Sequence, residues 1–380
     1  MRRKPIVNVL ISYQGNRRTV FLESLAQEIQ ARGHNVIFYS TAGRGVLTED
    51  LDSLGIKNRF AKSPDSKWGF IVQLRFLTSF IRANRIEVVF SHLQRANLVA
   101  LLVGRLLRLP VIPCRHHNDA SFVQGNRNAR LQDRLVNTLA RRQVVVSRQA
   151  KEFMVQNEGA NPHHVFHIPL GYDFDLYGQP SPAKMAKVQR LVNHQIRLII
   201  VARHMPTKRH DIAIKLVAEL AKADIDAGLI IMDEGQTTDA LKRITQELKV
   251  EDRVYFVGFQ DDITSYVSAS DLIVHPSISE SSNQVIKEAA MLGKTGVVCK
   301  GVGDFDDYLV DKRNAFVVDP NNTLSEMVEA LTALFSSVDY RSDLEQMAAI
   351  LQPEVKERFN IGMVVDAYFD LALRGALTEQ

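Results

Sequence analysis

Residues 275–300 read HPSISESSNQVIKEAAMLGKTGVVCK, and this stretch predicts the fold of the second half of the chain. The apolar residues 272–274 before it, followed by Pro276, predict a short buried strand. Small polar residues at 277–282 predict a loop, and a helix is predicted from near Asn283 to a stop at Gly293. Apolar residues 296–299 predict the next strand. This succession is the unit from which parallel α/β sheets are built.

Two glutamates lie in this unit. Glu280 is in the predicted loop, and Glu288 lies about one and a half turns into the predicted helix. Ligands of parallel α/β sheets bind beyond the carboxyl ends of the strands, where Glu280 is expected. The backbone N–H groups of Ser282, Asn283 and Gln284 at the helix start suit a phosphate. The Glu288 carboxylate could accept paired hydrogen bonds from a ribose diol. The pattern alone fits equally an N-capped helix with two solvated glutamates.

Composition bounds the class of protein. The 380 residues suffice for two domains, and 46% hydrophobic with 24% charged residues is typical of a soluble globular protein. No apolar run approaches the roughly 20 residues of a membrane span, and residues 1–13 predict a first strand rather than a signal peptide. Cys114 and Cys299 show no disulfide or zinc spacing, which favours a reducing cytoplasm. The net charge of +4 is too mild to indicate nucleic acid but is compatible with anionic substrates or a loose hold on an acidic inner-membrane surface.

Strand-like and helix-like segments alternate along the whole chain, which predicts parallel sheets with helices on both faces. In the first half, strands are predicted at residues 5–13, 34–39, 86–90, 110–115, 143–146 and 165–168. In the second half they are predicted at residues 196–201, 227–232, 254–257, 272–275, 296–299 and 315–318. Residues 169–182 predict a linker, and residues 353–374 predict one long amphipathic helix.

We therefore expect an α/β protein of two doubly wound, Rossmann-like domains with ligands in a cleft between them. The expected boundaries are residues 1–172 for the first domain and 173–355 for the second. Residues 356–380 form a C-terminal helix that could cross back to the first domain.

The two glutamates also carry a family resemblance. Glu280, seven intervening residues and Glu288, followed by AAMLGKTGVV, resemble the Glu-x7-Glu motif of retaining GT-B glycosyltransferases of the family 4 type, the glycosyl transferases group 1. In that family the pattern is usually E-G-F-G-x-x-x-x-E-A-M-A-x-G-x-P-V-V. Here residues 281–283 (Ser-Ser-Asn) replace the glycine-rich turn and residues 295–296 (Thr-Gly) replace Pro-Val, while Gly293 keeps its place. The resemblance implies a GT-B fold and a nucleoside diphosphate sugar as donor, UDP rather than GDP. It also implies that residues 1–172 bind the acceptor and that residues 173–355 bind the nucleotide sugar.

A basic loop extends the resemblance. VARHMPTKRHD, residues 201–211, resembles the family's G-R-x-x-x-x-K-G segment, with Ala202 and Arg209 in the places of the two glycines. Arg203 and Lys208 could clamp a diphosphate and neutralise the charge that develops on the leaving group, a role that substitutes for a metal. The alternative is a solvated basic loop.

Two sites are expected in the first half. Gly15, in the loop after the first strand, would let the backbone approach a phosphate or sugar, or it forms an ordinary tight turn. The G-x-G-x-x-G fingerprint of dinucleotide-binding folds is absent. His116 and His117 follow the strand predicted at 110–115. The resemblance implies that His116 binds a hydroxyl of the donor sugar without acting as nucleophile, and the alternative is a capping histidine.

The remaining motifs are weaker. In similar enzymes Gly258 and Phe259 would cradle the base, and residues 233–235 (Asp-Glu-Gly) stand where those enzymes carry G-D-G. Asp306 and Asp307 stand near the place of a family glutamate and are interpreted as surface charge. Four arginines recur at helical spacing and could receive a lipid-linked diphosphate or form a solvated helix face: Arg127, Arg130, Arg134 and Arg141. Residues 67–85 mix aromatic and basic side chains that could lie on a membrane or pack in the core.

The resemblance thus implies a retaining hexosyltransferase that moves a hexose or N-acetylhexosamine from a nucleotide sugar to a surface glycan, such as lipopolysaccharide, or a lipid-linked saccharide. The expected catalytic residues are Glu280, His116, Arg203 and Lys208. Two alternatives stay open: a nucleotide-sugar epimerase or hydrolase of the same fold, and a non-enzymatic relative that binds glycans or partners.

Overall fold

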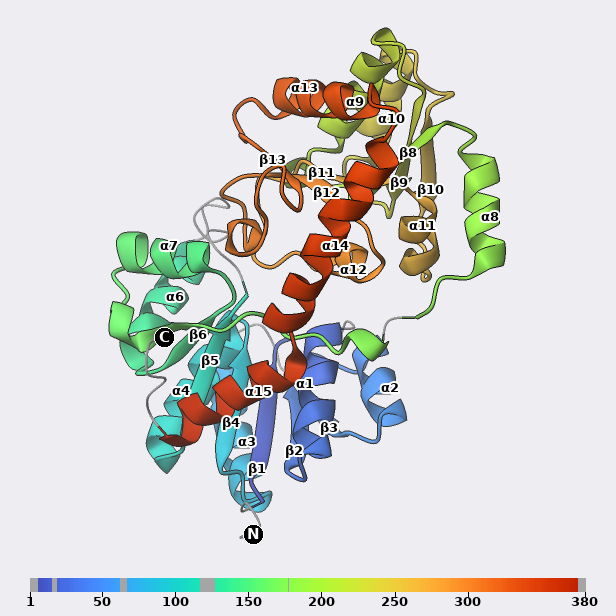
Figure 1. The fold of residues 1–380 in the computed structure, drawn as a ribbon. Helices are drawn as coiled ribbons and strands as arrows, with labels where there is room; N and C mark the ends of the chain where they lie inside the picture. The colour runs from blue at the N-terminus through green and yellow to red at the C-terminus, as the bar shows by residue number, and fades with distance from the viewer. Residues whose placement is uncertain (1–5, 16–18, 62–66, 117–126, 177, 375–380) are drawn as a thin grey trace. The chain divides into compact units, whose positions relative to one another are not determined.

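The computed structural model describes residues 6–15, 19–61, 67–116, 127–176 and 178–374. Contacts between Cα atoms divide the chain into two compact units, residues 1–173 together with 359–380, and residues 174–358. Each unit contains one parallel sheet packed against helices, which confirms the predicted α/β class (Figure 1). The boundary at residues 173–174 falls within the predicted linker.

The sheet of the first unit has seven parallel strands in the order β3-β2-β1-β4-β5-β6-β7. The strands are β1 (Asn8–Tyr13), β2 (Asn35–Ser40), β3 (Lys57–Phe60), β4 (Val88–His92), β5 (Val111–Arg115), β6 (Gln143–Val145) and β7 (Val165–His167). The order reverses direction between β1 and β4. In doubly wound folds, ligands bind at such a switch point, beyond the carboxyl ends of the strands.

Helices cover both faces of this sheet because its strands are apolar on both sides. The helices are α1 (Val20–Ala31), α2 (Val46–Ser53), α3 (Lys67–Ala83), α4 (Gln94–Leu107), α6 (Arg127–Leu139), α7 (Arg148–Glu158) and α15 (Ile361–Phe369). Val9 and Ile11 of β1 join one buried cluster with residues of α1 and α15, while Leu10 joins a second with residues of α3 and α4. Successive side chains of a strand point to opposite faces, so one strand serves both clusters.

Two elements of the first unit, α2 and β3, were not predicted. The sequence of β3 is KNRF, and its burial alternates between exposed and half-buried residues because it is the edge strand. A polar edge strand offers none of the apolar runs on which the other strand predictions rest.

The sheet of the second unit has six parallel strands in the order β10-β9-β8-β11-β12-β13. The strands are β8 (Ile196–Val201), β9 (Ala227–Met232), β10 (Val254–Gly258), β11 (Leu272–His275), β12 (Gly296–Cys299) and β13 (Phe316–Val318). The helices are α8 (Pro182–Leu191), α9 (His210–Lys222), α10 (Thr238–Glu247), α11 (Ile263–Ala269), α12 (Gln284–Met291), α13 (Thr323–Phe335) and α14 (Tyr340–Arg358). Because β8 and β11 are neighbours, the loops that follow them leave the sheet side by side.

The predicted single helix over residues 353–374 is wrong. Helix α14 already begins at Tyr340, contains Pro353 and ends at Arg358, and α15 begins separately at Ile361. Asn360 separates them: its backbone is extended, and its side chain accepts a hydrogen bond from the N–H of Met363, as an N-cap does. Residues from 359 onward belong to the first unit, where Tyr172 donates to the Phe359 carbonyl at 2.8 Å.

The aromatic residues of α3 divide between core and surface. Phe76 and Phe80 pack against Tyr39, with ring centroids 5.6 and 5.7 Å from it, whereas Trp68 is 78% exposed. Within the described residues, none of the helices combines the length and the apolar character that a membrane span requires.

Candidate functional site

The unit predicted around Glu280 and Glu288 is present. Strand β11 ends at His275, and α12 begins at Gln284 with Asn283 as its N-cap. The Oδ1 atom of Asn283 accepts a hydrogen bond from the N–H of Ile286 at 3.0 Å, and Gly293 has the left-handed φ of +69° that suits the end of a helix. Glu280 therefore lies in the loop beyond β11, and Glu288 lies inside the helix.

Glu280 is the centre of a charged cluster. Its Oε1 atom lies 2.6 Å from Nζ of Lys208 and 2.6 Å from Nε2 of His275. The two loops are also joined through the backbone, because the N–H of Ile278 donates to the carbonyl of Thr207 at 3.0 Å. The cation predicted in the loop after β8 and the acid predicted in the loop after β11 thus meet within the second unit.

The environment keeps Glu280 ionised. Burial by itself would raise the pKa of this carboxyl, but the hydrogen bond from His275 and the charges of His275 and Lys208 outweigh it and lower the pKa to about 2. A carboxylate that stays charged accepts hydrogen bonds from sugar hydroxyls at any physiological pH.

The turn after Glu280 is braced by a buried ion pair that the sequence did not reveal. Nζ of Lys287 contacts Oδ2 of Asp304 at 2.5 Å and also donates to Ser282 Oγ and the Asn283 carbonyl, both at 2.8 Å. Asp304 in turn accepts from Ser282 Oγ at 2.7 Å and from the N–H of Asn283 at 3.2 Å. Side chains therefore hold the Ser-Ser-Asn turn, and the N–H of Asn283 already has a carboxylate partner.

Gly303 is a further residue that the sequence did not reveal. Its φ is +63°, and a Cβ atom at this position would lie 2.8 Å from Cβ of Glu280. A side chain at 303 would therefore displace the loop that carries Glu280. The segment KGVGD, residues 300–304, contains the only sequence signal, a glycine next to an acid.

Glu288 and Arg203 lie on elements of the same unit. Glu288 is 8% exposed and accepts a hydrogen bond from Nε2 of Gln284, one turn earlier on α12, at 2.5 Å. Arg203 follows β8 and is exposed, and it makes no hydrogen bond or ion pair with the described residues. Its guanidinium is available to an incoming anion.

Arg209 occupies the place of a family glycine and keeps the backbone shape a glycine would take. Its φ is +52°, in the left-handed region, which costs an L-residue about 1 kcal/mol. The guanidinium donates to the Pro320 carbonyl at 3.1 Å and to Thr323 Oγ1 at 2.9 Å. These bonds direct Arg209 toward the start of α13, so Lys208, rather than Arg209, contacts Glu280.

The loops after β9 and β10 lie beside these elements. A Cβ atom on Gly235 would lie 2.5 Å from the carbonyl oxygen of His204, so only glycine allows the β8 and β9 loops to approach this closely. Gly258 has a φ of +66°, and the next residue, Phe259, is 70% exposed at the carboxyl end of β10. An exposed ring at this edge suits stacking against a base.

In the first unit, Gly15 lies beyond β1 and is fixed by its neighbours. A Cβ atom there would lie 2.4 Å from the ring of Tyr13, and Ser40 Oγ donates to the Gly15 carbonyl at 2.6 Å. His116 lies directly after β5, as predicted, and His117 lies outside the described residues.

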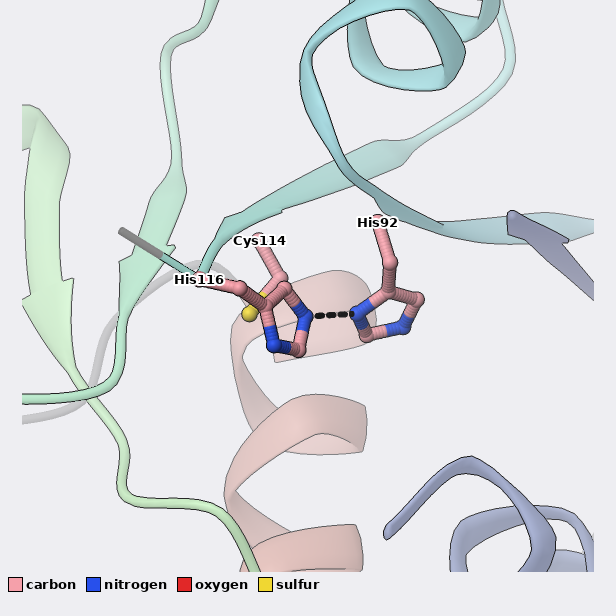
Figure 2. Close-up of side chains that lie close together, drawn as sticks. All are labelled: His92, Cys114 and His116. Atoms are coloured by element: carbon pink, nitrogen blue, oxygen red, sulfur yellow. Dashed lines mark hydrogen bonds between the residues drawn. The ribbon is translucent and has the colours of Figure 1, made fainter. Parts of the chain in front are cut away.

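Figure 2 shows a partner of His116 that sequence reasoning missed. The rings of His92, at the end of β4, and His116 face each other with Nδ1 of His92 2.8 Å from Nε2 of His116. His92 is 0% exposed, and its Nε2 atom has no hydrogen-bond partner. A proton on Nε2 would be a buried donor without acceptor, so we assign it to Nδ1, which then donates to His116.

Cys114 lies beside this pair, and its ligand atom and those of the two histidines are within 4.8 Å of one another (Figure 2). Burial raises the pKa of the Cys114 thiol to about 12 and is the main cause that lowers the pKa of His92 well below its ordinary value. The Cys114 thiol and the His92 ring are therefore uncharged in this arrangement, and the hydrogen bond satisfies the two nitrogens that face each other.

The weaker motifs have ordinary surroundings. Asp306 is exposed and accepts from the N–H of Gly301 at 3.0 and 3.1 Å, which fits its interpretation as surface charge. Arg127, Arg130 and Arg134 lie on α6, whereas Arg141 follows the end of that helix.

Comparison with known proteins identifies the family. The glycosyl transferases group 1 family matches residues 183–349, and glycosyltransferase family 4 matches residues 19–176. The D-inositol 3-phosphate glycosyltransferase of Corynebacterium diphtheriae is 24% identical over 335 residues, 80% of this chain and 78% of that protein. An Escherichia coli UDP-Gal:alpha-D-GlcNAc-diphosphoundecaprenol alpha-1,3-galactosyltransferase is 22% identical over 351 residues, 86% of each protein.

Solved structures agree on the fold. The crystal structure of Anabaena HepE in complex with UDP and glucose superposes with a TM-score of 0.81 at 20% identity, covering 96% of this chain and 99% of that one. The two family matches, one to each half of the chain, and the two parallel sheets show that this chain belongs to the GT-B glycosyltransferases of the group 1, family 4 type.

Proposed function

We propose that the chain transfers a hexose or N-acetylhexosamine, with retention of configuration, from a UDP-sugar to a surface glycan or a lipid-linked saccharide. The observation that carries the proposal is the contact between Lys208 and Glu280 at 2.6 Å, which joins a cation and an acid from two separate loops. The E. coli relative, whose name gives UDP-Gal as donor and a diphosphoundecaprenol-linked acceptor, and the UDP and glucose bound to HepE support a UDP-sugar.

Each donor group has a proposed partner in the second unit. The Lys208 ammonium has three N–H donors, of which one is engaged by Glu280 and another, at 3.5 Å, by the Ser279 carbonyl, so it could bind phosphate without leaving the acid. Arg203 would bind the same diphosphate, Glu280 the sugar hydroxyls and Glu288 the ribose. Gly258 and Phe259 would hold the base, with Ser282, Asn283 and Gln284 lining the phosphate side of the turn.

The chemistry we propose needs no metal. As the glycosidic bond breaks, negative charge develops on the leaving diphosphate, and Arg203 and Lys208 would stabilise it. Retention would follow from attack of the acceptor on the face that the diphosphate leaves, with the leaving phosphate taking the acceptor's proton. The acceptor would enter between Gly15 and His116 of the first unit, with Gly15 also binding the donor and His116 holding a hydroxyl of the donor sugar.

The test is a screen of UDP- and GDP-sugars by thermal unfolding, followed by transfer assays. A ligand that binds only the folded protein adds about 2.7 kcal/mol of stability at 100 times its dissociation constant. We expect UDP-sugars to stabilise the protein and Lys208→Ala or Glu288→Ala to abolish this effect. Lys215→Ala, on the exposed side of α9, is the matched control.

Other outcomes would point elsewhere. Turnover of the donor without any acceptor would indicate a hydrolase or epimerase, and binding without turnover of any donor would indicate a non-enzymatic relative. We also place the enzyme in the cytoplasm with a peripheral contact to the inner membrane, which cell fractionation would test.

A further inference from the structure

A hollow of about 530 Å³ in the first unit is lined by four arginines. Arg105 and Arg108 come from the end of α4 and the turn after it, and Arg141 and Arg142 follow the end of α6. The rest of the lining is apolar apart from Gly104, and no acidic side chain contributes to it. The pocket therefore combines concentrated positive charge with an apolar floor.

The pocket lies at the opposite edge of the sheet from Gly15 and His116. It is lined by Val111, where β5 begins, and by Arg142, which directly precedes β6. His116 and Gly15, by contrast, follow the carboxyl ends of their strands. Parallel strands all start at one edge and end at the other, so the pocket is not part of the site described above.

Two of the arginines are held at the pocket by backbone carbonyls. Nη2 of Arg105 donates to the Leu139 carbonyl at 3.0 Å, and Nη1 of Arg142 donates to the Leu371 carbonyl at 2.7 Å. A guanidinium has five N–H donors, so most of them remain for a ligand. These bonds also offer the ordinary explanation, that cations near a helix end cap its carbonyl groups.

Capping of helix carbonyl groups does not account for the other two arginines of the pocket. The side chains of Arg108 and Arg141 are exposed and make no hydrogen bond with the described residues. No carboxylate among those residues pairs with any of the four arginines. Four neighbouring cations without counter-charge repel one another, and an anion bound among them would relieve that repulsion.

We propose that this pocket binds a phosphate group, and that the phosphate belongs to an anionic phospholipid headgroup. Planar guanidinium groups match phosphate oxygens in pairs. Leu106, which follows Arg105 at the end of α4, is 69% exposed. Arginines beside exposed leucines are the combination that holds a protein at a membrane surface.

The experiment measures sedimentation of the full chain with two kinds of vesicle, pure phosphatidylcholine and an equimolar mixture with phosphatidylglycerol. The variants are Arg108→Ala, Arg141→Ala and the pair together, because neither side chain supports the fold. The control is the pair Arg190→Ala and Arg243→Ala, two exposed arginines of the second unit that change the net charge equally.

We expect the protein to sediment with the anionic vesicles only. Each pocket arginine removed should weaken that binding about fivefold, which corresponds to about 1 kcal/mol per charge near the surface. The control pair should bind as the unchanged protein does. An equal loss of vesicle binding in the control pair, or no loss in the pocket variants, would refute the proposal that the pocket binds the headgroup.

Inorganic phosphate distinguishes a lipid from a soluble ligand. Phosphate could raise the melting temperature of the unchanged protein and not that of the Arg108→Ala, Arg141→Ala double variant, while neither protein binds vesicles. That result would support a phosphate site in the pocket but refute its assignment to a lipid. Donor binding by the second unit is measured in parallel with a UDP-sugar. Because the pocket variants should retain it, failure of this proposal and failure of the proposed function give different results.

Discussion

Lys208 Nζ and Glu280 Oε1 lie 2.6 Å apart although the two residues are 72 positions apart in the chain. They meet because β8 and β11 are adjacent and parallel, so that the loops after both strands emerge at one edge of the sheet. His275, the last residue of β11, contacts the same oxygen and holds the acid in place.

Replacing Lys208 tests the role of its charge. We expect Lys208→Ala to lower kcat/KM for donor by about 100-fold or more, the usual cost of removing one group that stabilises transition-state charge. Lys215→Ala, which removes a surface lysine paired with Asp211, should leave kcat/KM unchanged. Steady-state kinetics with a UDP-sugar measures both, and an active Lys208→Ala enzyme would refute the role.

The pH dependence of stability tests Glu280. Its pKa is lowered from 4.5 to about 2, so the folded state holds this proton less tightly than the unfolded state. The resulting stability is fully present above pH 4.5 and is lost as the pH falls from 4.5 toward 2.

Urea unfolding of the unchanged protein and of Glu280→Gln measures this effect. The difference in unfolding free energy between them should be constant near neutral pH and shrink by up to about 3 kcal/mol below the ordinary pKa of the carboxyl. Glu247→Gln, on the exposed side of α10, is the control and should show no such change. A difference for Glu280→Gln that stays constant down to acid pH would contradict the prediction.

The buried pair Lys287–Asp304 is expected to dominate the stability of the Ser-Ser-Asn turn at residues 281–283. Lys287→Met should cost about 3–5 kcal/mol of unfolding free energy, because it leaves the Asp304 carboxylate buried without its cation. The double variant Lys287→Met, Asp304→Leu should cost less than the two single changes added together. Lys222→Met, which breaks the exposed pair with Glu219, should cost under about 1 kcal/mol. Chemical denaturation compares the variants, and additive costs would mean that the pair does not act as a unit.

His92 is expected to position His116. His92→Phe removes the hydrogen bond to Nε2 of His116 and should lower kcat by about tenfold with little change in KM. His92→Gln, which can still donate, should restore much of the activity. If His92→Gln is as inactive as His92→Phe and both variants lose stability, His92 has a purely structural role.

Chelation tests the proposed independence from metal. We expect EDTA to leave the transfer rate unchanged, because Arg203 and Lys208 supply the positive charge at the diphosphate. A loss of activity that zinc restores would instead indicate a metal site at His92, Cys114 and His116, whose ligand atoms lie within 4.8 Å of one another.

Much of the fold followed from local patterns. The strands at residues 196–201 and 227–232 match their predicted bounds, because each is an apolar run between clear breakers. The polar edge strand β3 and the break at Asn360 lacked such signals. A short capping side chain inside a helical pattern is easily taken for a surface residue.

By itself, the sequence determined the two parallel sheets and the residues most worth testing, Glu280, Glu288, Arg203 and Lys208, since apolar periodicity and motif spacing are properties of the chain. Only the tertiary structure decided which groups meet: Lys208 with Glu280, Lys287 with Asp304 and His92 with His116. The physical reason is that strand order and burial bring together residues far apart in the sequence. Those contacts then set the charge and hydrogen bonding of each group, which spacing along the chain does not encode.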